Sequence, residues 1–113
     1  MNKICTDILQ SKKLAEILPL ESADCYYPNR IDIKYQGILP IEYKHGNPLL
    51  SQEIAAWSIS ALLEIIRNNG RYKLQIFEGG YYFEANGFIT ESYFNPVDTC
   101  YEFILKLHEL NIL

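Results

Sequence analysis

Hydrophobic residues are densest between Ser51 and Arg67, in the segment SQEIAAWSISALLEIIR, where they recur with a helical period. At about 100° per residue, the polar side chains fall on one narrow stripe, made of Glu53, Ser60, Glu64 and Arg67. The apolar side chains fill an arc of roughly 200°, twice the width found on an ordinary surface helix. The pattern therefore predicts a central helix that several other elements cover.

Two further helices are predicted, one near each end of the chain. The first spans residues 6–18, and Thr6 or Asp7 is suited to cap its N-terminus. The last begins at Asn95-Pro96, because proline fits the first helical position, where no amide hydrogen is needed. The central helix is expected to end at Asn68-Asn69-Gly70, since Asn and Gly are the usual residues of a helix C-terminus.

Alternation of apolar and polar residues, the period of a half-buried strand, predicts five strands. Tight turns are expected at Gly79-Gly80 and Asn86-Gly87, so the last three strands form an antiparallel meander. Pro40 either restricts the second strand to the edge of a sheet or ends it early. The five ranges are 31–35, 38–44, 71–78, 81–85 and 88–93.

The predicted order of elements is therefore α-β-β-α-β-β-β-α. Consecutive antiparallel strands with helices before and after them indicate the α+β class. We expect one domain over residues 1–113, with an antiparallel sheet that ends in the C-terminal meander. Half-polar strands such as 71–78 predict that the helices pack on one face of the sheet and leave the other face in water.

Charge and composition exclude several classes of function. The net charge of −4 argues against binding to nucleic acid or to anionic membranes, which needs a basic face. No apolar run is long enough to span a bilayer, and the N-terminal residues lack the pattern of a targeting signal, so a cytoplasmic protein is expected. Cys5, Cys25 and Cys100 are an odd number and contain no CxxC pair, which predicts free thiols on small core or surface residues. We expect neither a metal nor a cofactor.

Four segments carry a family resemblance: SKKLAEIL, SADCYYP, AAWSISALLEII and NPVDTCYEFILKL. In this order and spacing they resemble a family of small uncharacterised proteins encoded by gut Bacteroidetes and by their phages and mobile elements. Residues 23–28 and 57–66 are the most specific parts. The chain departs from the family at residues 50–53, where relatives have a proline close before the tryptophan. The resemblance implies a genomic setting and carries no activity, substrate or catalytic residue.

Individual polar residues give no catalytic motif. Ser58 falls on the apolar side of the central helix, where a serine is expected to bond back to a carbonyl one turn earlier. Trp57 is expected to be an anchor of the core or of its boundary. Dispersed acid–base residues leave open an enzyme or ligand-binding site assembled in space, for which the candidates are Asp24, Asp32, Glu42 and His45.

The best candidate for a binding site is the solvated face of the C-terminal meander. Aromatic side chains beside the Gly79-Gly80 turn and charged neighbours along the strands form a mixed surface of the kind that binds proteins. The residues are Lys73, Gln75, Phe77, Tyr82 and Glu84. The leading hypothesis is thus a small accessory protein of a phage or mobile element that binds another protein. The alternatives are an enzyme or ligand binder and a structural homodimer that buries this sheet face.

Overall fold

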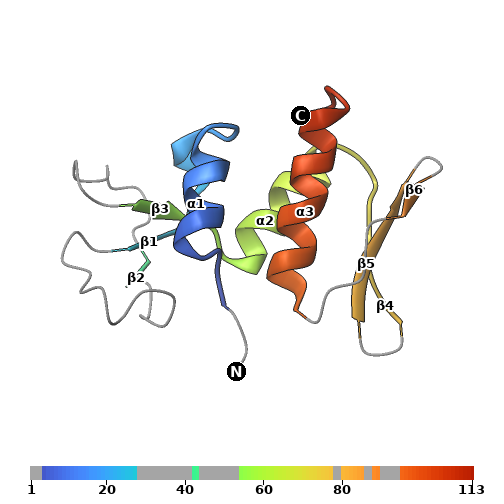
Figure 1. The fold of residues 1–113 in the computed structure, drawn as a ribbon, viewed down its shortest axis with the longest axis horizontal. Helices are drawn as coiled ribbons and strands as arrows, with labels where there is room; N and C mark the ends of the chain where they lie inside the picture. Colours follow the sequence, from blue (N-terminus) through green and yellow to red (C-terminus); the bar gives the residue numbers. More distant parts are fainter. Residues whose placement is uncertain (1–3, 28–41, 44–53, 78–79, 86–87, 90–94) are drawn as a thin grey trace.

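The computed structural model of the chain describes residues 4–27, 42–43, 54–77, 80–85, 88–89 and 95–113. Within these ranges, three α-helices lie in the middle of the molecule and a small antiparallel sheet lies at each end (Figure 1). The molecule is elongated, with principal extents of 43 × 29 × 20 Å. The predicted α+β class is confirmed. The expectation of one sheet is wrong, because the N-terminal strands and the C-terminal strands pair in two separate sheets.

The N-terminal sheet is built around strand β1 (Cys25–Tyr27), which the sequence pattern did not predict. It pairs antiparallel with β2 (Glu42–Tyr43) on one side and with β3 (Ile54–Ala56) on the other. Helix α1 (Ile8–Ala15) packs against β3. A short 3-10 helix, η1 (Leu20–Ser22), connects α1 to β1. The predicted strand at 31–35 lies outside the described residues.

The C-terminal sheet has the order β4 (Leu74–Phe77), β5 (Gly80–Ala85) and β6 (Phe88–Ile89), with antiparallel neighbours as predicted. Phe77 pairs with Gly80, so the prediction that Gly80 belongs to a turn is wrong: it is the first residue of β5. Gly79 lies outside the described residues. The predicted turn at Asn86-Gly87 lies outside the described residues, between the paired residues Ala85 and Phe88.

The predicted central helix is wrong over its first half. Helix α2 (Ile59–Asn68) begins only after Ser58, whose extended backbone makes it the N-cap. The apolar residues Ile54–Ala56 instead form strand β3, because their backbone groups pair with those of β1. A short apolar run is compatible with either a buried strand or a buried helix, and here a neighbouring strand decides between them.

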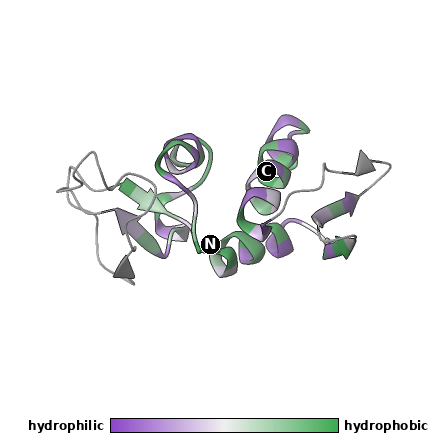
Figure 2. Cartoon of the chain, turned by 60° about the horizontal axis from the view of Figure 1, so that its bottom comes forward, coloured by the Kyte–Doolittle hydropathy of each residue, from purple (hydrophilic) through white to green (hydrophobic). Residues whose placement is uncertain are grey.

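The predicted ends of the helices are confirmed at three places. Asp7 caps α1: its carboxylate accepts the amide N–H of Gln10 at 2.7 Å, and the Gln10 side chain accepts the N–H of Asp7. Asn95 caps helix α3 (Pro96–Glu109), with Pro96 in the first turn. Helix α2 ends at Asn68 and is followed by Asn69 as its C-cap. Figure 2 shows hydrophilic and hydrophobic stretches alternating along the helices, as in amphipathic segments.

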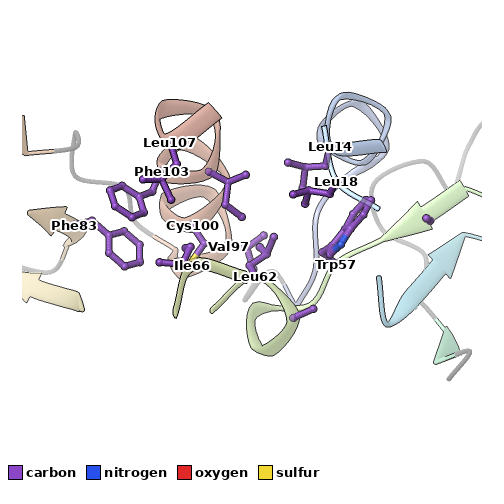
Figure 3. Packing of buried hydrophobic residues seen from close by; sticks show 13 residues of the cluster. Leu14, Leu18, Trp57, Leu62, Ile66, Phe83, Val97, Cys100, Phe103 and Leu107 are labelled. Carbon is purple, nitrogen blue, oxygen red and sulfur yellow. The ribbon is translucent and has the colours of Figure 1, made fainter. Parts of the chain in front are cut away.

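One hydrophobic cluster extends from α1 through α2 and α3 to β5. Leu14 and Leu18 lie beside Trp57 at one side of the view in Figure 3, and Phe83 lies at the other side. The Phe83 ring stacks on that of Phe103 from α3, with ring centres 4.3 Å apart. The buried members are Leu14, Leu18, Ala55, Trp57, Ala61, Leu62, Ile66, Phe83, Val97, Cys100, Phe103, Ile104 and Leu107.

Truncation of Leu62 tests the orientation of α2. Leu62 is fully buried and Glu64, two residues later, is exposed. We expect Leu62→Ala to lower the free energy of unfolding by roughly 2–5 kcal/mol, because it removes apolar contacts and leaves a cavity. Glu64→Ala is the matched control and should change it by less than about 0.5 kcal/mol. Urea denaturation of both variants measures the two values, and equal losses would contradict this orientation of the helix.

The start of α2 can be tested at Ser58. Its hydroxyl oxygen accepts the N–H of Ala61 at 3.3 Å and thereby caps the helix. Ser58→Ala should lower the free energy of unfolding by about 1–2 kcal/mol, as at other N-caps. Ser60→Ala, at an exposed position inside the same helix, should be neutral or slightly stabilising because alanine is the better helix former. A helix that began near Ser51 would give similar, small effects at both positions.

Candidate interaction surface on the C-terminal hairpin

The pairing of β4 with β5 sorts their side chains onto two faces. Gln75 lies opposite Tyr82, and Leu74 lies opposite Phe83. Directly opposed residues of an antiparallel pair share a face, and successive residues alternate between faces. Since Phe83 is buried against α3, the face that carries Gln75 and Tyr82 is turned away from the helices. We call it the outer hairpin face.

The outer hairpin face brings together most of the predicted binding residues. The Tyr82 side chain is half-buried, and its hydroxyl group donates a hydrogen bond to Oε1 of Gln75 at 3.3 Å. Glu84 is exposed two residues further along β5, and exposed Lys73 directly precedes β4. Phe77, the fifth predicted residue, pairs through its backbone with Gly80 at the end of the hairpin, so it does not lie opposite Tyr82.

The chemistry of this face suits a protein surface. A tyrosine offers a large apolar ring with a polar tip, and such residues are enriched where proteins bind one another. Lys73 and Glu84 carry opposite charges, so the face has no excess of positive charge to attract phosphate groups. The hydrogen bond from Tyr82 to Gln75 restricts the phenol ring before any partner binds.

Ile76 is a surface feature that the sequence pattern did not reveal. Alternation places it on the inner face with Leu74 and Phe83, yet 70% of its surface is exposed. Helix α3 packs on β5, where Thr99 donates a hydrogen bond to the carbonyl oxygen of Tyr81 at 3.3 Å. Strand β4 lies one strand further out, so Ile76 is left uncovered. Periodicity indicates the face of a strand but not how far a covering helix reaches.

The polar residues around the start of α2 have structural roles. The Asp24 carboxylate accepts the backbone N–H of Ser58 at 2.9 Å and also its hydroxyl group, as well as the thiol of Cys25 at 3.4 Å. The expected bond from Ser58 to a preceding helical carbonyl is wrong, since Ser58 precedes the helix. Asp24 is therefore engaged in holding the helix start. Asp32 and His45 lie outside the described residues. For Glu42 the structure describes only the backbone, which belongs to strand β2.

Trp57 is an anchor of the core, one of the two positions predicted for it. Its side chain is fully buried, and its indole N–H donates to the hydroxyl oxygen of Ser22 at 3.0 Å. Its backbone N–H donates to Oγ1 of Thr6 at 3.1 Å, and its carbonyl oxygen accepts the N–H of Thr6. A tryptophan buried with its N–H bonded fills space and fixes neighbours, so it offers no free surface to a ligand.

The three cysteines are buried thiols. Burial raises the pKa of Cys100 to about 12, and burial together with the Asp24 carboxylate raises the pKa of Cys25. The thiolate is the form that attacks electrophiles and binds metals, and both environments oppose it. In the parts of the chain that the structure describes, no three His, Cys, Asp or Glu side chains are close enough to hold a metal ion.

Comparison with family models, with curated proteins and with solved structures gives no match for this chain. The resemblance to small proteins of gut Bacteroidetes and their phages stays a prediction. Over the described ranges, none of the helices has both the length and the apolar composition that crossing a membrane requires.

The buried thiols predict a fall in stability at alkaline pH. The pKa of Cys100 lies above its unfolded value of 9.0, so the thiol contributes stability that is complete below pH 9 and is lost as pH rises toward 12. Denaturation curves between pH 8 and 11 should show this decline, and it should be smaller for Cys100→Ala.

A thiol reagent at neutral pH should modify the cysteines rapidly only in denaturant. Fast modification of the native protein would contradict their burial.

Proposed function

We propose that this chain is a small accessory protein that acts by binding another protein through the outer hairpin face. The observation that carries the proposal is the half-buried ring of Tyr82, held by Gln75 and flanked by exposed charges of both signs. A central aromatic residue with a polar and charged surround is the composition of a protein–protein contact. Asp7, Asp24, Ser58 and Asn95 are instead used to hold the starts of helices.

Three features favour binding over catalysis. Asp24 and Ser58, an acid–hydroxyl pair in direct contact, satisfy each other and the first turn of α2. Cys25 and Cys100 are held as neutral thiols, because burial raises the pKa of each. The outer hairpin face lies on paired strands whose opposite side is fixed to α3 by the stacked rings of Phe83 and Phe103. A surface on such a rigid support loses little conformational entropy when a partner binds.

The proposed setting is the cytoplasm of a gut Bacteroidetes cell, with the gene carried by a phage or a mobile element. Thiols that stay reduced in a protein core are typical of a reducing compartment. The genomic setting rests on the resemblance of residues 23–28 and 57–66 to that family. The partner is thus expected to be a cytoplasmic protein of the host or of the same element.

The test is capture of a partner by the tagged protein from a Bacteroidetes lysate, followed by mass spectrometry and by affinity measurement with the purified partner. Tyr82→Ser should weaken binding about 30-fold, which corresponds to the loss of about 2 kcal/mol at a central aromatic contact. The control is Leu9→Ser, which removes an 80% exposed apolar side chain from α1, remote from the hairpin.

Both variants should keep the melting temperature within a few degrees of the parent, so that weakened binding reports on the surface and not on folding. Loss of binding with Tyr82→Ser and not with Leu9→Ser supports the proposal. A partner that binds the folded Tyr82→Ser variant with unchanged affinity would show that the outer hairpin face is not the contact.

A further inference from the structure

Strand β4 lies at the edge of the C-terminal sheet. The strand order β4-β5-β6 gives it one neighbour, β5, within the described part of the chain. Among the described residues, Leu74–Phe77 make no backbone hydrogen bond apart from those of the ladder with β5. Alternate N–H and C=O groups of β4 therefore point away from β5, as they do along the edge of any antiparallel sheet.

Apart from its short length, β4 lacks the devices by which proteins protect such an edge. Its four residues, Leu-Gln-Ile-Phe, include no charged residue, no proline and no glycine. The register with β5 continues without a bulge from Leu74 to Phe77. Ile76 is 70% exposed on this strand. An uncharged, regular edge strand with an exposed β-branched residue is a template on which another extended strand pairs.

We propose that β4 pairs with β4 of a second copy of this chain, antiparallel and about a two-fold axis. The two three-stranded sheets then form one sheet of six strands. The axis passes beside Gln75, so that Gln75 of each copy faces its counterpart. The occupant of the edge is a strand because the groups it presents are backbone hydrogen-bonding groups, which only an extended backbone satisfies in series.

The second copy fits because β4 complements itself in this register. Ile76 of each copy lies opposite Leu74 of the other, on the same face, so both exposed isoleucines gain an apolar cross-strand neighbour. The Gln75 amides oppose each other and can exchange hydrogen bonds. No charged residue of one β4 meets a like charge of the other, so the net charge of −4 on each chain does not oppose the contact.

The pairing is closed, because a two-fold axis uses the same edge on both copies and leaves neither free for a third. It also differs from a dimer that buries the sheet face. Tyr82 lies on β5, one strand inside the edge, so the outer hairpin face stays open in the dimer and occurs twice on one continuous sheet. The inference is thus independent of the proposed function.

The first experiment is the molar mass of the full chain by sedimentation over a range of concentrations. The expected mass is twice the 13.1 kDa of one chain. Ile76→Lys places two ammonium groups against Leu74 across the axis and should return the mass to that of the monomer. Leu9→Lys adds the same charge at an exposed apolar site on α1 and should leave the dimer intact. A parent chain that stays monomeric at the highest concentration would overturn the proposal.

The second experiment tests the register. Gln75→Cys places a thiol from each copy on the two-fold axis, so oxidation by a disulfide reagent should link the copies rapidly. Glu84→Cys places an exposed thiol on the same face but on β5, away from the edge, and should link slowly. Equal rates for the two variants, or a dimer that survives Ile76→Lys, would assign the contact to another surface and reject pairing through β4.

Discussion

Trp57 and Ser58 mark the point where the chain changes from strand β3 to helix α2, and several other elements are fixed by their hydrogen bonds there. The backbone of Trp57 pairs with Thr6 and its indole N–H bonds to Ser22, while Ser58 is held by Asp24. The buried indole ring also belongs to the cluster that extends through α2 and α3. Segments far apart in the sequence thus meet at two adjacent residues. If the chain continued as a helix through this point, β3 would be lost and with it the central pairing of the N-terminal sheet.

The carboxylates of Asp7, Asp24 and Asp98 lie at the N-terminal ends of α1, α2 and α3. Asp7 and Asp24 accept backbone N–H groups that the helices cannot satisfy themselves, and negative charge at this end also favours the helix dipole. Asp98 accepts the side-chain amides of Asn95 and Gln10, which connects the starts of α3 and α1. These groups stabilise the helices and the contacts between them. Their use in the fold weakens the alternative of an enzyme with dispersed acids, of which Asp24 was a candidate.

The sequence patterns succeeded where the decisive interaction is local. The caps at Asp7 and Asn95 and the alternation along residues 74–77 depend on neighbours a few positions away, and each was predictable. Helical periodicity failed at Ile54–Ala56 because the choice between strand and helix rests on β1, a partner about 30 residues earlier. A local signal was nonetheless present: Ser58 is a preferred N-cap residue, and Trp57 and Leu62 occupy the two positions of a hydrophobic staple. Of the outer hairpin face, the side of the strands on which Gln75 and Tyr82 lie was predictable. The register was not, because the turn was predicted at Gly79-Gly80 whereas Phe77 pairs with Gly80. The exposure of Ile76 was not, since it depends on how far α3 extends across the sheet.

The two proposed contacts of the hairpin share Gln75 but otherwise use different groups of the same strands. Stacking of Phe83 on Phe103 fixes β5 against α3, and alternation then turns Tyr82 to the outside. The face contact consists of side chains, whereas the edge contact consists chiefly of backbone groups of β4. A side chain on β5 therefore stays accessible when another strand pairs with β4, and both contacts can form at once. Pairing at the edge would moreover place two outer hairpin faces side by side, which raises the apparent affinity for any partner that presents two matching sites.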